Sequence, residues 1–200
     1  MKQSLFVLLA IAGFIACKNN TPASTEATTT QKDTSTAPKS FFPVVDFIGG
    51  EMKMVDSLQL PLTKTVTINK KEKLTHLSDA EFRMLAKNFT EPDINTSALK
   101  RFYTETSIAD ESIPSIAFTY TTTDTSLTIQ KVNVFVKPDP IENDKVRGIY
   151  IEKVFRSGDT VIQQKLYWKT GRNMQINTEK RIGDKHLPAE QVKVVWDPTE

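Results

Sequence analysis

The second half of the chain alternates apolar and polar residues, and this pattern constrains the fold more than any other feature of the sequence. An alternation at period two turns every second side chain to the same face of a β-strand. Turn-forming Gly, Pro and Asp residues separate the alternating segments. The pattern predicts about six consecutive antiparallel strands, at residues 116–120, 132–136, 149–151, 162–168, 174–176 and 192–196.

One turn between these segments predicts a strand register. Ser157-Gly158-Asp159-Thr160 suits a two-residue type II′ hairpin loop, in which glycine takes the first central position. Ser157 then pairs with Thr160, and apolar or oppositely charged residues face one another along both strands, as cross-strand energetics prefer. The turn at Gly171 leaves two- and three-residue loops open. Counting outward from Gly158, a core face carries Phe155 with Ile162, Ile151 with Leu166 and Ile149 with Trp168, and the opposite face carries Val154 with Gln163, Glu152 with Lys165 and Tyr150 with Tyr167.

The first half of the folded part has helical periodicity interrupted by one short hairpin. Apolar residues at helical spacing predict a helix from Pro43 to Val55. Residues 64–77 predict a hairpin around Asn69-Lys70-Lys71. Ser78, with Glu81 three residues later, forms a capping box that begins a second helix, and Pro92 ends it.

These patterns together predict an α+β domain. N-terminal helices and a short hairpin precede an antiparallel sheet of about six strands, with the helices packed on one face. The domain is expected over residues 41–200, a length that suits one folding unit. The net charge is +2 and charges of both signs are interspersed, so nothing indicates a nucleic-acid surface.

The N-terminus predicts export from the cytoplasm and a lipid anchor. A positively charged start precedes an unbroken apolar run from Leu5 to Ala16, which is typical of a secretory signal peptide and too short to span a membrane. The single cysteine, Cys17, follows at once. Phe14-Ile15-Ala16-Cys17 resembles the lipobox of bacterial lipoproteins, with Phe14 in place of the usual leucine. The resemblance covers only residues 14–17.

The resemblance implies that residues 1–16 are removed and that acyl chains are attached to Cys17. Several acyl chains give stable membrane anchoring where one gives only marginal binding. The mature domain would then contain no cysteine, and therefore neither a disulfide nor a thiol nucleophile. The residue after the cysteine is Lys18 rather than Asp, which by resemblance favours the outer membrane, with the domain facing the periplasm.

Residues 17–40 are expected to form the lipidated cysteine and a disordered tether. The stretch after Cys17 contains no aromatic residue and no Leu, Ile or Val, so it cannot bury enough apolar surface to order itself. A flexible chain of this length spans on the order of 25 Å. Its many Thr and Ser residues leave glycosylation open as an alternative role.

The sequence contains no recognisable catalytic or metal-binding pattern. His76 and His186 are far apart and have no second ligand at a useful spacing. There is no Gly-x-Ser-x-Gly elbow and no phosphate-binding glycine loop. Paired carboxylates need only meet in space, and Glu105, Asp110 and Glu111 are better interpreted as loop charges. We therefore expect no enzyme activity, no metal and no cofactor.

The sheet face opposite the core carries apolar side chains where an exposed face should be polar. Such a stripe predicts a contact surface for a partner or an apolar ligand, although a loop, a helix or the curvature of the sheet would also explain it. The predicted binding face consists of Phe135, Tyr150, Val154 and Tyr167, with Leu127 and Ile129 expected on the same face.

Three functions remain open from the sequence. The leading hypothesis is a non-enzymatic lipoprotein whose sheet domain binds another envelope component, such as a protein. The alternative is a carrier of an apolar ligand such as lipid, in a half-barrel cavity between helices and sheet, which is an analogy from architecture alone. The third is a hydrolase with paired carboxylates. An apolar cavity would favour the carrier, and an exposed patch around Tyr150 and Tyr167 would favour the binding protein.

Overall fold

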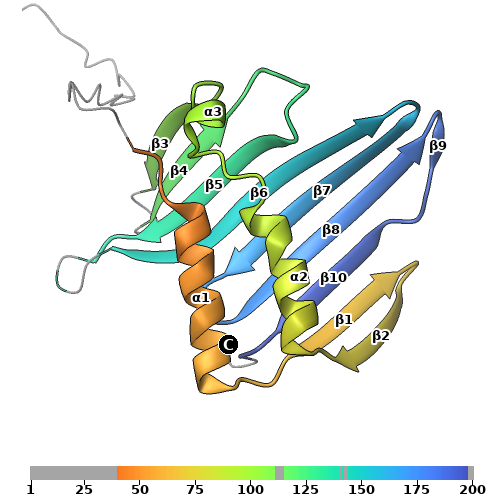
Figure 1. Cartoon of the computed structure of the whole chain (residues 1–200), viewed down its shortest axis with the longest axis horizontal. Helices are drawn as coiled ribbons and strands as arrows, with labels where there is room; N and C mark the ends of the chain where they lie inside the picture. Colours follow the sequence, from red (N-terminus) through yellow and green to blue (C-terminus); the bar gives the residue numbers. More distant parts are fainter. Residues whose placement is uncertain (1–39, 111–114, 140, 142–143, 198–200) are drawn as a thin grey trace, which may run out of the picture. The chain divides into compact units, whose positions relative to one another are not determined.

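The computed structural model describes residues 40–110, 115–139, 141 and 144–197. The expected signal peptide, Cys17 and nearly all of the tether lie outside these residues. Within the described part, ten strands form one antiparallel sheet with the order β2-β1-β10-β8-β7-β6-β5-β4-β3, and β9 pairs with β8 (Figure 1). The strands are β1 (Thr63–Ile68), β2 (Lys71–His76), β3 (Thr104–Asp110), β4 (Ser115–Thr121), β5 (Ile129–Lys137), β6 (Lys145–Ser157), β7 (Thr160–Lys169), β8 (Asn173–Ile182), β9 (Lys185–His186) and β10 (Glu190–Val195).

The size of this sheet corrects the fold prediction. An arrangement of about six strands with helices packed on one face is wrong, because the sheet has ten strands and makes up most of the domain. The hairpin expected as a separate element joins the sheet through pairing of β1 with β10, and β3 adds a strand at the other edge. Pairing between opposite ends of the domain leaves no trace in local periodicity, and β3 lacks a clear apolar alternation.

The register predicted around Gly158 is confirmed. Every pair expected from Ser157–Thr160 outward to Ile149–Trp168 is present. Gly158 has a φ of +53°, whereas Asp159 is not among the residues with positive φ, as a type II′ turn requires. At Gly171 the structure has the three-residue loop, since Lys169 pairs with Asn173.

Two longer helices and one short one accompany the sheet in the described part of the chain: α1 (Val44–Leu58), α2 (Asp79–Thr90) and α3 (Ser97–Lys100). The capping box at the start of α2 is confirmed, because the Ser78 hydroxyl accepts from the backbone N–H of Glu81 and the Glu81 carboxylate accepts from the backbone N–H of Ser78. Among the described residues, no helix combines the length and the hydropathy that a membrane span requires.

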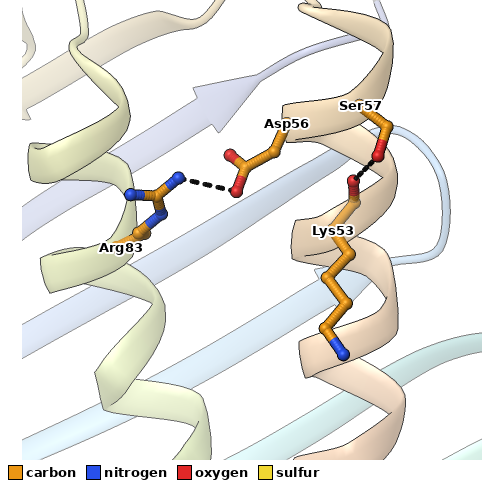
Figure 2. A network of polar contacts seen from close by, with 4 residues as sticks. All are labelled: Lys53, Asp56, Ser57 and Arg83. Carbon is orange, nitrogen blue, oxygen red and sulfur yellow. Dashed lines mark hydrogen bonds and ion pairs between the residues drawn. The ribbon is translucent and has the colours of Figure 1, made fainter.

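A surface ion pair joins α1 to α2. Figure 2 shows Arg83 of α2 reaching the Asp56 carboxylate of α1, at 2.7 Å. In the same view the Ser57 hydroxyl donates to the backbone oxygen of Lys53, one turn earlier in α1. An exposed pair of this kind contributes about 0–1 kcal/mol, so apolar contacts with the sheet must hold the helices in place.

An aromatic cluster supplies the contact between α2 and the sheet. Phe82 lies 5.6 Å from the Trp196 ring and 6.2 Å from the Trp168 ring, measured between centroids. Phe89, two turns later, meets Trp168 edge-on at 5.3 Å. Trp168 and Trp196 are 5.1 Å apart, and all four rings are buried. This cluster fixes which sheet face is the core face.

The helices cover only part of the core face. The distal ends of β6, β7 and β8 extend beyond α2 (Figure 1). Phe155 and Ile182 lie on these extensions and are 40% and 44% exposed. The strands are therefore longer than the core requires, which enlarges both faces of the sheet.

Candidate functional site: the outer face of the sheet

The sheet face turned away from Trp168 and the helices, called the outer face here, is accessible to solvent. In β7 and β8 the side chains that alternate with the buried core residues are all partly or fully exposed. Tyr167 is the most exposed aromatic residue among those predicted for the binding face, at 36%. The outer face therefore presents its side chains rather than burying them under another element.

All four residues predicted for the binding face lie on the outer face. Tyr150 pairs with Tyr167, and Phe135 pairs with Gly148, two residues before Tyr150 on β6. The structure thus groups the three aromatic residues around Gly148. Val154 lies further along β6, where it pairs with Gln163, beyond Glu152.

The expectation that Leu127 and Ile129 share this face is wrong. Ile129 is only 3% exposed and lies near Phe89 on the core side. The pairing of β5 with β6 shifts register between Ile129 and Lys131, so a bulge reverses the alternation there. Leu127 precedes β5 and packs against the core. The sequence prediction assumed an uninterrupted alternation through the bulge, and it therefore assigned both residues to the wrong face.

Tyr167 leans across β6 onto Gly148. A Cβ atom placed at Gly148 would lie 3.1 Å from the Tyr167 hydroxyl oxygen, 3.3 Å from its Cε2 and 2.7 Å from the backbone oxygen of Trp168. The last distance is a clash with backbone, so glycine permits a close approach that no other residue allows here. The hydroxyl end of the phenol ring therefore occupies the space above the glycine, and part of the residue is open to solvent.

Tyr150 is held in place by Glu152. Its hydroxyl donates to the Glu152 carboxylate at 2.9 Å. The pKa of Tyr150 is raised to about 12, mainly by burial and to a lesser extent by the hydrogen bond to Glu152 and the charge of that residue. The phenol therefore stays protonated at neutral pH. Glu152 itself lies between Lys131 on β5 and Lys165 on β7 in one cross-strand row, so positive and negative charges alternate.

Three amide side chains continue the outer face beyond the tyrosines. Gln175 and Gln191 both donate to the Asn177 side-chain oxygen, at 3.0 Å and 2.8 Å. Gln175 pairs directly with Tyr167, so the amides begin where the aromatic residues end. The mutual hydrogen bonds fix the orientation of all three side chains.

A depression of about 500 Å³ adjoins the amides. Lys165, Asn177, Gln191 and Thr67 line it from one cross-strand row over four neighbouring strands, from β7 to β1. The Asn69-Lys70 turn borders it, and the positive φ of both residues is that of a type I′ hairpin turn. Its volume lies in the range of small-molecule sites, and the residues that line it are mostly polar, although carbon atoms of their side chains make up more of the exposed lining than polar atoms do.

The space between α2 and the sheet is filled. Around Phe89, Ile94 and Ile151 the remaining volume is about 10 Å³, which is barely enough for one water molecule. Ile48, Phe82 and Trp168 are fully buried in this layer. The described core thus gives no support to a ligand cavity between helices and sheet.

Lys153 is a buried residue that sequence reasoning missed. It is 3% exposed, and its ammonium group donates to the backbone oxygen of Glu91, just after the end of α2. Burial lowers the pKa of Lys153 to about 8, and the charge of Glu91 opposes this shift. The confirmed hairpin register places position 153 on the core face between Ile151 and Phe155, so the register alone could have predicted that Lys153 is buried.

The other residues considered from the sequence are not gathered into a site. His76 and His186 are exposed on β2 and β9, and among the described residues no cluster of three or more His, Cys, Asp or Glu could hold a metal ion. Glu105 on β3 hydrogen-bonds Tyr120, while Glu111 and the side chain of Asp110 lie outside the described residues. Comparison with protein-family models, curated proteins and solved structures finds no match for this chain.

Proposed function

We propose that this chain is a lipid-anchored protein of the bacterial envelope whose outer face binds another envelope component without catalysis. The observation that carries the proposal is the placement of the Tyr167 ring above Gly148, in a residue that is 36% exposed. Large aromatic side chains supply contact area at low conformational-entropy cost. A ring that is already positioned loses little freedom when a ligand covers it.

The surroundings of Tyr167 favour recognition over reaction. A phenol with a pKa of about 12, as in Tyr150, is a poor proton donor or acceptor near neutral pH. The alternating charges of Lys131, Glu152 and Lys165 offset one another across the strands. The face is therefore a positioned surface of aromatic and polar groups, as a binding site requires.

The anchor rests on the lipobox resemblance of residues 14–17, with Cys17 as the lipidated residue and the outer membrane, facing the periplasm, as its location. Attachment by several acyl chains would hold the domain near a membrane. A component of the envelope is then the partner that the outer face meets most often. The carrier alternative receives no comparable support, because the core between α2 and the sheet is filled.

Site-directed photo-crosslinking in cells tests the proposal. A benzophenone side chain replaces Lys165, which is exposed on the outer face, and in the matched control it replaces Lys87, which is exposed on α2. We expect a crosslinked adduct of the full chain from position 165 and none from position 87. Equal adducts from both positions, or none from position 165, would contradict the outer face as the binding surface.

A further inference from the structure

We propose that the ligand of the outer face is a glycan chain, which lies across the strands and stacks one of its sugar rings on Tyr167. This inference rests on the proposed function, since it names the ligand class for the same face. Three features of the face carry it: an aromatic ring that leans over β6, a fixed group of amides beside the ring, and an open depression lined mostly by polar residues beyond them.

The first feature is the orientation of Tyr167. A pyranose ring presents its C–H groups on a flat face, and these pack against the electron-rich face of an aromatic ring. An aromatic ring that stands upright on a sheet offers only its edge. Because Gly148 has no side chain, the Tyr167 ring leans over β6 instead. It thus offers a surface on which a sugar ring can stack.

The second feature is the amide group of Gln175, Asn177 and Gln191. Sugar hydroxyls donate and accept hydrogen bonds at once, and a primary amide side chain can do both in return. The shared hydrogen bonds to the Asn177 oxygen hold these side chains in position before any ligand arrives. Amide groups of Gln175 and Gln191 that are not used in those bonds are available to hydroxyl groups.

The third feature is the length of the polar surface. Neighbouring strands lie about 4.8 Å apart, so the three steps from Tyr150 on β6 to Gln191 on β10 cover about 14 Å. The depression of about 500 Å³ belongs to the neighbouring cross-strand row, that of Asn177 and Gln191, and this row continues to Thr67 on β1. An open surface of this length suits an extended polymer rather than one small enclosed molecule.

The charges of the face argue against other ligand classes. Lys131, Glu152 and Lys165 alternate in sign along one row, so this row offers no run of a single sign to a polyanion. The amides and threonines beside the tyrosines are unsuited to an apolar lipid. A protein partner would be expected to bury an apolar centre, whereas the amides and Lys165 interrupt such a centre here.

Co-sedimentation with insoluble polysaccharides tests the inference. The full chain, purified in detergent, is mixed with cellulose, chitin and curdlan, which differ in sugar and linkage. We expect binding to at least one of them, weakened about tenfold by Tyr167→Ala and weakened also by Gln191→Ala. Tyr167→Phe retains the ring and should retain binding, which separates the contribution of the ring from that of the hydroxyl.

Phe155→Ala is the matched control, because Phe155 has a similar exposure in the same hairpin but lies on the core face. It should leave sedimentation unchanged. Absence of binding to all three polysaccharides, or an equal loss in the Phe155 variant, would overturn the glycan proposal. If the adduct from position 165 then persists and is digested by protease, the ligand is a protein, and the binding function stands without the glycan. If the adduct is also absent, both proposals fail.

Discussion

The phenol ring of Tyr167 occupies the space above Gly148 that the side chain of any other residue would fill. The two residues lie on neighbouring strands: the glycine leaves the space, and the tyrosine covers the exposed backbone. Aromatic residues that cover a glycine on a neighbouring strand also help to fix strand register. The proposed binding surface is therefore tied to the stability of the sheet at this position.

Replacing Gly148 by alanine tests this relationship. The added Cβ would lie 2.7 Å from the Trp168 backbone oxygen and 3.1 Å from the Tyr167 hydroxyl, so β6 and β7 must separate locally. We expect the free energy of unfolding to fall by about 1–3 kcal/mol, measured by urea denaturation. Gly50→Ala is the control, because Gly50 lies inside α1 with nothing within 4 Å of its would-be Cβ, and there alanine should stabilise by about 0.5–1 kcal/mol. Equal effects of the two substitutions would contradict the close approach.

Lys153 predicts a pH dependence of stability. Its pKa is about 8 in the folded protein and 10.5 ordinarily, so the unfolded chain binds the proton more tightly. The unfolding free energy should therefore rise as pH increases from about 8. Three tyrosines with pKa values raised to about 12, Tyr103, Tyr120 and Tyr150, act in the opposite direction above about pH 10.

The contribution of Lys153 is isolated by comparing the wild type with Lys153→Met between about pH 7.5 and 9.5. The methionine has no charge to bury, so the rise in urea midpoint with pH should be smaller in this variant. Lys87→Met, at an exposed position on α2, should follow the wild type. Parallel pH profiles for the wild type and Lys153→Met would show that the buried ammonium group does not titrate in this range.

The packing of Phe82 between α2 and the sheet should contribute strongly to the free energy of unfolding. Its ring is fully buried against Trp168 and Trp196, so Phe82→Ala should lower the unfolding free energy by about 3–5 kcal/mol. Phe102 is 39% exposed, and Phe102→Ala should change it by about 0.5 kcal/mol. Tryptophan fluorescence during urea unfolding measures both. A small effect at Phe82 would mean that other contacts position the helix.

The proposed membrane attachment depends on acylation of Cys17. Cys17→Ser should abolish labelling of the protein by a fatty-acid probe in a bacterial host, because the thiol is the expected acylation site. Ser57→Ala, far from the lipobox, should be labelled as the wild type is. Labelling that persists in the Cys17 variant would refute the lipobox interpretation of residues 14–17.

Local chemistry explains which parts of the fold the sequence predicts. The register of the Ser157-Thr160 hairpin can be predicted from the sequence, because a two-residue turn with glycine at its first position fixes every pair beyond it. The total number of strands in the sheet cannot be predicted in this way, because β1 pairs with β10 from the other end of the domain. The bulge before Lys131 has no comparable turn residue, so the alternation gave the wrong face for Ile129.

In the candidate site, too, the features set by local sequence could be predicted, whereas those set by long-range strand pairing could not. Alternation within β6 and β7 correctly places Tyr150, Val154 and Tyr167 on the outer face. A glycine within a strand signals a close approach, so Gly148 was an available clue to the aromatic group. The amide cluster was not predictable, since Gln191 reaches Asn177 only through the pairing of β10 with β8.

The proposed binding function is tested most directly by asking whether the two outer-face tyrosines are needed for contact with the envelope component. The benzophenone adduct from position 165 is measured in the Tyr150→Ser, Tyr167→Ser double variant, and in a Phe102→Ser, Phe155→Ser double variant, which removes two aromatic residues elsewhere with exposures similar to that of Tyr167. We expect the adduct to be lost in the tyrosine variant and retained in the phenylalanine variant. An undiminished adduct in the tyrosine variant would contradict the proposed binding function.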